Sequence, residues 1–231
     1  MIPLFTWFYI GGYVIGVLAF LAMATRRNLT SEKTLHIMGV ALIGGLIGAN
    51  VAQWLVSGTP GKTVLGGILG GYLSVLGYKR YLGETRPYGD LFAVAISAGE
   101  SIGRWGCFLG GCCYGKPTRG WLHVWQHEAW RYPTQAYLAF GNLAILIALL
   151  LLERKRVLPE NGLFCVQGIL YCFLRWGVEF YRDSPVWWAG WTVAQWSCVA
   201  GLLFFTGYLM RLCSQQQQSA SASNALFRER S

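Results

Sequence analysis

The sequence predicts an all-α, polytopic membrane protein with about seven transmembrane helices, and three observations lead to this prediction. Of the 231 residues, 54% are hydrophobic and only 13% are charged, a balance that a soluble domain of this length rarely has. The apolar residues gather in stretches of roughly 20, long enough to cross a hydrocarbon core of ~30 Å. Basic residues gather between alternate stretches, as the positive-inside rule expects.

The apolar stretches follow one another along most of the chain. We place them at about residues 4–25, 34–56, 63–82, 88–110, 133–153, 161–181 and 189–211. No basic segment precedes the first stretch and two arginines follow it, so we expect a retained helix and not a cleaved signal peptide. The polar segment that follows the last apolar stretch, about residues 213–231, lacks apolar periodicity. We therefore predict a transmembrane domain over about residues 1–212 and a disordered cytoplasmic tail over about 213–231.

The distribution of basic residues predicts the orientation of the chain. With the N-terminus outside, the inner segments carry 12 of the 19 Lys and Arg residues and the outer segments carry five. The other two, Arg104 and Arg175, fall within or at the end of a span. The rule places the C-terminus inside, and it accounts for the net charge of +9 without a nucleic-acid partner.

Two predicted helices carry ion pairs inside the membrane. Glu100 and Arg104 are four residues apart in the fourth span, and Arg175 and Glu179 are four apart in the sixth. This spacing brings each acid and base onto one helix face, and the balanced charges make burial feasible. An ionisable group in hydrocarbon costs roughly 2.5–3.5 kcal/mol and therefore indicates a functional site. The alternative is a structural role, or that Arg175 and Glu179 extend to the outer interface.

Further polar residues favour the functional interpretation. Tyr171 lies on the same helical stripe as Arg175 and Glu179, while Gln135 and Gln195 come early in neighbouring spans that begin at the outer side. Polar groups that converge at one depth, bordered by aromatic rings, are typical of a lipid-headgroup pocket open to the outer leaflet.

Small residues mark two neighbouring spans, in "GGLIGAN" at 44–50 and "LGGILGGYL" at 65–73. They allow helices to approach closely. They also leave room for a glycerophosphate that backbone N–H groups could bind, which makes Gly66 and Gly67 candidate binding residues.

Three cysteines follow Arg104 in "GESIGRWGCFLGGCCYG" at 99–115. Thiols beside an arginine can act as nucleophiles or acyl carriers, or they form a disulfide or pack inertly at an oxidising face. His123 and His127 downstream complete a set of zinc-ligand types. However, no C-x-x-C pair is present, adjacent Cys112 and Cys113 are awkward joint ligands, and "GWLHVWQHEAWRYP" is typical of an interfacial stretch with Trp anchors. We therefore expect no metal and no cofactor.

The segment "GRWGCFLGGCCYG" at 103–115 resembles the signature G-R-x-G-N-F-x-N-x-E-x-x-G of the prolipoprotein diacylglyceryl transferase family. The resemblance continues in "LGGILGG" (65–71), in "RYPTQAY" (131–137) and in "YCFLRWGVEFYRD" (171–183). The order and spacing of the motifs agree with the family over about residues 5–210.

The resemblance implies a seven-helix enzyme of the bacterial inner membrane. Family members transfer the diacylglyceryl group of phosphatidylglycerol to the lipobox cysteine thiol of a secreted lipoprotein precursor and release glycerol phosphate. By resemblance, Arg104 holds phosphate and Arg175 with Glu179 forms a second essential pair. The expected substrate-binding residues are Gly66, Gly67, Gly103, Cys107, Cys112, Gln135 and Tyr171.

The chain also departs from the family pattern. Asn, Asn and Glu of the signature are replaced by Cys107, Gly110 and Cys112. The histidines of two other family motifs are replaced by Leu65 and Tyr132, and an acidic residue that follows the second of these motifs is replaced by Leu138. Glu100, one turn before Arg104, is expected to replace the lost carboxylate as a catalytic residue. The alternatives are thiol chemistry at the cysteines, a paralogue that transfers a glycerolipid group to another thiol or hydroxyl, or a non-catalytic protein that binds or transports lipid.

Overall fold

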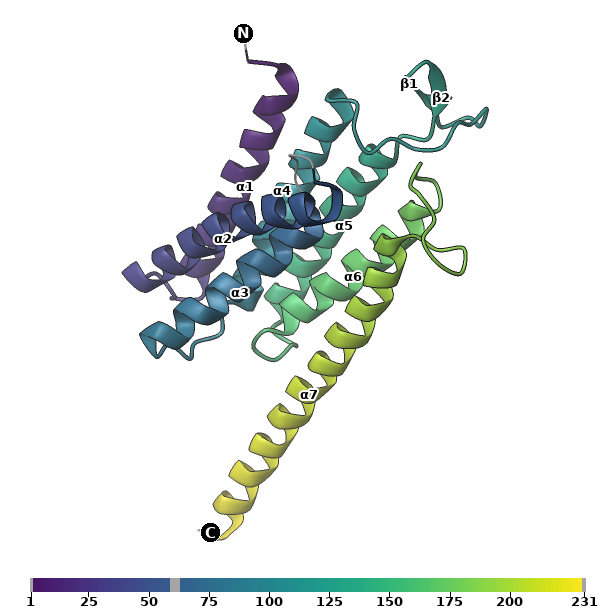
Figure 1. Cartoon of the computed structure of the whole chain (residues 1–231). Helices are drawn as coiled ribbons and strands as arrows, with labels where there is room; N and C mark the ends of the chain where they lie inside the picture. The colour runs from purple at the N-terminus through teal and green to yellow at the C-terminus, as the bar shows by residue number, and fades with distance from the viewer. Residues whose placement is uncertain (1, 59–62, 230–231) are drawn as a thin grey trace. The chain divides into compact units, whose positions relative to one another are not determined.

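The computed structural model describes residues 2–58 and 63–229. Lys62 and Arg230, which contribute to the predicted charge asymmetry, lie outside the described residues. The elements are α1 (Leu4–Arg26), α2 (Glu32–Ser57), α3 (Val64–Leu82), α4 (Gly89–Leu109), β1 (Val124–Gln126), β2 (Ala129–Arg131), α5 (Thr134–Lys155), α6 (Gly162–Glu179) and α7 (Val193–Glu229) (Figure 1). Each apolar stretch of the sequence therefore forms one helix.

Four helices of the described chain are long and apolar enough to cross a membrane, namely α1, α2, α5 and the first part of α7. The other three have lower hydropathy because they carry charged residues together with glycines. Among these are Asp90, Glu100 and Arg104 in α4. The structure fits an all-α membrane protein, whereas seven spans and the orientation of the termini remain predictions.

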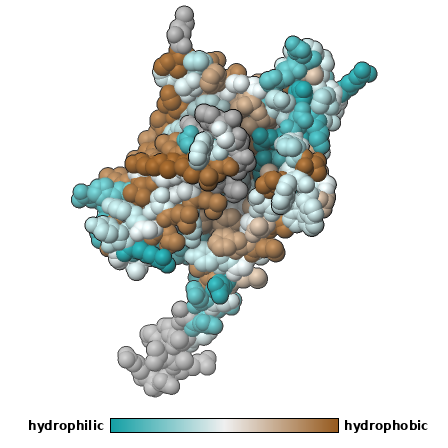
Figure 2. Space-filling model, viewed as in Figure 1, coloured by the Kyte–Doolittle hydropathy of each residue, from teal (hydrophilic) through white to brown (hydrophobic). Residues whose placement is uncertain are grey.

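Helix α5 has the polarity expected of a helix that faces lipid. Phe140, Ile147 and Leu151 are exposed, whereas Gln135 and Asn142 are fully buried. Because an apolar face in contact with lipid costs nothing, polar side chains are directed to the inside of such a protein. Hydrophobic residues accordingly spread over the helices in Figure 2, and hydrophilic ones gather at the hairpin.

The chain forms two compact units, residues 21–86 and residues 1–20 with 87–231. In the first of these, α2 and α3 are in backbone contact through their glycines. A Cβ atom at Gly48 would lie 2.7 Å from the Cα of Gly70, and one at Gly44 would lie 2.9 Å from the Gly70 carbonyl oxygen. Any larger side chain would separate the helices, so the packing interpretation of the two small-residue stretches is confirmed.

In the other unit, α4 packs against α5 and α6, and α6 packs against α7. Buried Asp90 at the start of α4 accepts hydrogen bonds from the Asn161 and Phe164 amides at 3.0 and 3.1 Å. Asn161 Oδ1 in turn accepts the Gly89 amide at 2.9 Å. These reciprocal bonds satisfy amides at the start of α4 and α6 and hold the two helices together at this end.

Two segments have a local structure that differs from the one expected from the sequence. The tail after residue 213, predicted to lack regular structure, continues α7 as helix to Glu229. It contains no Gly or Pro, and extending an existing helix costs little. The interfacial stretch forms the β1–β2 hairpin, whose turn residues His127 and Glu128 both have positive φ, the geometry of a two-residue type I′ turn.

Candidate active site

Arg104 is the buried cation of the site, with 5% of its surface exposed. Its Nε atom donates to Glu100 Oε2 at 2.7 Å, and its Nη2 atom lies 2.6 Å from the same oxygen. Nη2 also donates to the Tyr171 hydroxyl at 3.3 Å. The predicted pairing of Glu100 with Arg104 is confirmed, and Tyr171 joins this pair to α6.

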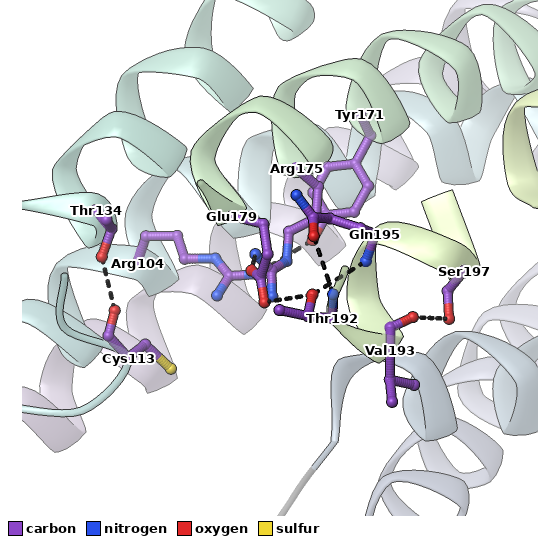
Figure 3. A network of polar contacts seen from close by, with 10 residues as sticks. All are labelled: Arg104, Cys113, Thr134, Tyr171, Arg175, Glu179, Thr192, Val193, Gln195 and Ser197. Atoms are coloured by element: carbon purple, nitrogen blue, oxygen red, sulfur yellow. Dashed lines mark hydrogen bonds and ion pairs between the residues drawn. The ribbon is translucent and has the colours of Figure 1, made fainter. Parts of the chain in front are cut away.

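The second predicted pair is also formed. Arg175 Nη1 donates to Glu179 Oε2, and Glu179 is buried. The other carboxylate oxygen, Oε1, accepts the Thr192 hydroxyl at 3.0 Å. Figure 3 shows these side chains near Arg104 and Tyr171, so the polar groups of α4, α6 and the start of α7 form one network.

Thr192 belongs to this network, although it was not among the site residues predicted from the sequence. Its hydroxyl accepts the Gln195 amide at 3.3 Å, and Gln195 Oε1 accepts the Thr192 amide at 2.9 Å. This is a capping box at the start of α7. The pattern Thr-x-x-Gln before an apolar run was the signal that could have found it. Gln195, predicted to face the pocket, instead uses its carbonyl oxygen to cap α7.

Gln135 and Thr134 begin α5 and are fully buried. Gln135 Nε2 donates to the Cys112 carbonyl at 2.7 Å and to Gln126 Oε1 at 3.2 Å. Thr134 Oγ1 donates to the Cys113 carbonyl at 2.8 Å. Gln135 Oε1 accepts no hydrogen bond from the residues that the structure describes. Gln135 therefore anchors the turn after α4 through its amide nitrogen.

That turn has the geometry of a Schellman motif. The Cys112 amide donates to the Cys107 carbonyl at 3.1 Å, the Gly111 amide donates to the Phe108 carbonyl at 3.3 Å, and Gly111 has φ 65°. In this motif the residue two positions after the cap lies over the last full turn of the helix. Here the two residues brought into contact are Cys112 and Cys107.

Cys113 completes a cluster of three thiols. It also has a positive φ, 61°, and the Sγ atoms of Cys107, Cys112 and Cys113 all lie within 4.8 Å of one another. All three are free thiols. Hydrogen bonds from Cys107 and Cys112, together with the charges of Arg182 and Arg104, lower the pKa of the Cys113 thiol, which lies beyond the end of α4.

The remaining predicted site residues lie apart from these contacts. A Cβ atom at Gly103 would have no atom of the described residues within 4 Å, so the helix surface is open at this position. Gly66 and Gly67 belong to the other unit, where both approach α2. His123, one residue before β1, contacts the Gly120 carbonyl, and His127, in the hairpin turn, contacts the Gly111 carbonyl. Neither histidine joins the thiol cluster, the one group of metal-ligand types found among the described residues.

Comparisons with known proteins agree with the order of the motifs. A family model described as prolipoprotein diacylglyceryl transferase matches residues 1–211. Similar proteins include three that are named phosphatidylglycerol–prolipoprotein diacylglyceryl transferase. The one from Clostridium tetani is 28% identical over 197 residues, which cover 74% of this chain and 78% of the relative. The one from Streptococcus agalactiae serotype Ia is 24% identical over 237 residues, covering 92% and 91%. The one from Dehalococcoides mccartyi is 31% identical over 170 residues, covering 68% and 64%.

Proposed function

Because the chain belongs to the prolipoprotein diacylglyceryl transferase family, we propose that it transfers the diacylglyceryl group of phosphatidylglycerol to the lipobox cysteine thiol of a prolipoprotein. The observation that carries this proposal is the buried guanidinium of Arg104, held by Glu100 and Tyr171. A planar cation in a low-dielectric site is well suited to a phosphodiester.

The proposed reaction forms one bond and breaks one. The acceptor sulfur attacks the glyceryl carbon that bears the phosphate, a C–S bond forms, and the C–O bond to phosphate breaks. Glycerol phosphate leaves with the bonding electron pair. Arg104 stabilises the charge that develops on the leaving phosphate. The thiol proton passes to Glu100, which lies one helical turn from Arg104, and then to the departing phosphate.

Arg175 and Glu179 have a different part in this proposal. Both oxygens of Glu179 accept hydrogen bonds, from Arg175 and from Thr192, which leaves this carboxylate poorly placed to accept a proton. We assign Arg175 as a second cation of the site and Glu179 as a positioning residue for it. Tyr171 orients Arg104, and Gly103, Cys107, Cys112 and Gln135 border the space for substrate. Gly66 and Gly67 remain proposed contacts of the lipid.

The proposed enzyme is a seven-span protein of the bacterial inner membrane with its N-terminus outside and its C-terminus inside. The lengths of the helices support this. Helices α4 and α6 have 21 and 18 residues, which at ~1.5 Å per residue is close to the ~30 Å of a hydrocarbon core. Glu100 is paired with Arg104 and Arg175 with Glu179, which reduces the cost of placing these charges in the membrane. Residues 213–231 form the proposed cytoplasmic tail.

Reconstitution tests the proposed reaction. The purified chain is placed in vesicles with phosphatidylglycerol labelled in its acyl chains, and a lipobox peptide is added. We expect label on the peptide, and no label on a control peptide with Ser in place of the lipobox Cys. A folded protein that binds phosphatidylglycerol and labels no peptide would contradict the proposal and support a non-catalytic lipid-binding protein.

A further inference from the structure

The thiol cluster, Cys107, Cys112 and Cys113, has the composition of a metal site. Three Sγ atoms lie within 4.8 Å of one another. Around one ion with metal–sulfur bonds of about 2.3 Å, sulfurs are separated by about 3.8–4.0 Å. Side-chain rotations that move each sulfur by less than ~1 Å would bring the three sulfurs to that spacing.

The backbone already has the conformation that such a site requires. Adjacent cysteines normally direct their side chains apart. For this reason the sequence alone did not favour Cys112 and Cys113 as ligands of one metal ion. Here the Schellman motif brings Cys112 over Cys107, and the positive φ of Cys113 turns the next side chain back toward both. Buried Thr134 and Gln135 bind the carbonyl groups of Cys113 and Cys112 at 2.8 and 2.7 Å. The turn is therefore held in place from α5, as ligands of a preorganised site are.

The chemistry of the donors selects the class of metal. Three sulfurs and no carboxylate or imidazole form the cluster among the described residues, and thiolates prefer soft ions such as Cu⁺ and Zn²⁺. Tyr9 donates to Cys107 Sγ at 3.4 Å and orients it from α1.

We propose that Cys107, Cys112 and Cys113 together bind one soft, thiophilic metal ion, Cu⁺ or Zn²⁺, at the end of α4. The site extends beyond the proposed transferase activity, because its geometry depends on sulfurs and on the turn and not on a bound lipid. With Zn²⁺, a water molecule completes the usual four ligands; Cu⁺ needs only the three sulfurs.

Metal binding to the full-length chain in detergent tests this inference. The protein is reduced, freed of reductant and incubated without oxygen with Zn²⁺ alone or Cu⁺ alone. Bound metal per chain is then measured after gel filtration. We expect one ion per chain for at least one of the two metals, and the metal with the higher affinity identifies the preferred ion. Failure of both metals to bind overturns the proposal, whatever the result of the transferase assay.

Substitutions locate the bound ion. Cys112 is exposed, so Cys112→Ser should fold, and loss of a ligand should weaken binding by more than about 100-fold. Cys213→Ser, in α7, is the matched control and should bind as the native chain does. A second measurement needs no variant: metal should protect Cys112 of the native chain from alkylation by maleimide. Unchanged affinity in Cys112→Ser, or alkylation of Cys112 at the same rate with metal bound, contradicts the proposal.

Discussion

At the scale of single residues, the site depends on how Arg104 is kept charged while buried. Glu100 supplies a counter-charge from the same helix face, and Tyr171 supplies an oxygen from α6. A guanidinium can keep both partners and still offer N–H groups to a phosphate, because it has five donors. An ammonium has three donors and no planar fork.

Arg104→Lys is therefore expected to lose most of the transferase activity. The loss of one charged, bidentate contact costs about 1.5–3 kcal/mol, which corresponds to a decrease in kcat/KM of roughly ten- to hundredfold. The assay is label transfer from phosphatidylglycerol to the lipobox peptide. Arg119→Lys, at an exposed loop position, is the control. Turnover of Arg104→Lys at the native rate would remove Arg104 from phosphate binding.

Glu100→Gln distinguishes the two candidate reactive groups. The amide keeps the size of the side chain but cannot accept a proton or balance Arg104, so transfer should be abolished while phosphatidylglycerol binding remains measurable. Glu160→Gln, at an exposed position, is the control. If the thiols were the reactive centre, Glu100→Gln would only weaken transfer and a triple alanine variant of Cys107, Cys112 and Cys113 would be inactive.

Arg175 and Glu179 should behave as a coupled pair. Replacing either one leaves an uncompensated buried charge, at a cost of about 3–5 kcal/mol in stability. The double variant Arg175→Met with Glu179→Gln should recover most of that stability without recovering activity. Thermal unfolding in detergent and the transfer assay measure the two effects. A double variant that is both stable and fully active would show that the pair is needed neither for folding nor for the reaction.

At the scale of elements, the start of α7 links the stability of a helix to the geometry of the site. The Thr192 hydroxyl accepts the Gln195 amide and donates to Glu179 Oε1. One hydroxyl group therefore caps α7 and binds the carboxylate that positions Arg175. Removing it affects two elements that are separated in the sequence.

Thr192→Val should lower both stability and activity. The lost cap costs about 1 kcal/mol, and a buried carboxylate oxygen left without its partner costs a further ~1–3 kcal/mol. Thr192→Ser should restore most of both, since it keeps the hydroxyl. Ser197→Ala, which removes a hydroxyl that donates to the Val193 carbonyl of the same helix, is the control for thermal unfolding. Equal melting temperatures for Thr192→Val and the native chain would contradict the capping role.

At the scale of the whole molecule, the helices expose apolar faces and bury polar groups, as helices of proteins in a lipid bilayer do. Arg119 follows α4 and Arg154 lies near the end of α5, so the proposed orientation places them on opposite sides of the membrane. The exposed apolar positions include Leu143 and Leu203.

Labelling with a membrane-impermeant maleimide tests the proposed orientation. In intact spheroplasts, Arg119→Cys should gain label above that of the native chain, whereas Arg154→Cys should gain label only after the membrane is permeabilised. Both positions are exposed, so a difference in labelling reports the side of the membrane. The reverse pattern would place the N-terminus inside and contradict the charge-based assignment.

The sequence by itself determined the features that depend on short spacing. Apolar stretches of a helix's length predicted the seven helices, and the i, i+4 spacing predicted both ion pairs, because neighbours on one helix face are set by the helical repeat. The glycine contacts between α2 and α3 were also predictable from two short small-residue stretches.

Only the tertiary structure decided which distant groups meet. The Tyr171 hydroxyl contacts Arg104 across 67 positions, and Gln135 binds the Cys112 carbonyl across 23. The turn after α4 has two positive φ angles, which bring the adjacent cysteines into a cluster with Cys107. His123 and His127 contact different carbonyl groups in and beside the hairpin, although a helix would have brought them onto one face. These outcomes depend on the packing of helices and on backbone turns, which residue spacing does not encode, because side-chain direction at a turn is set by the local φ and ψ angles.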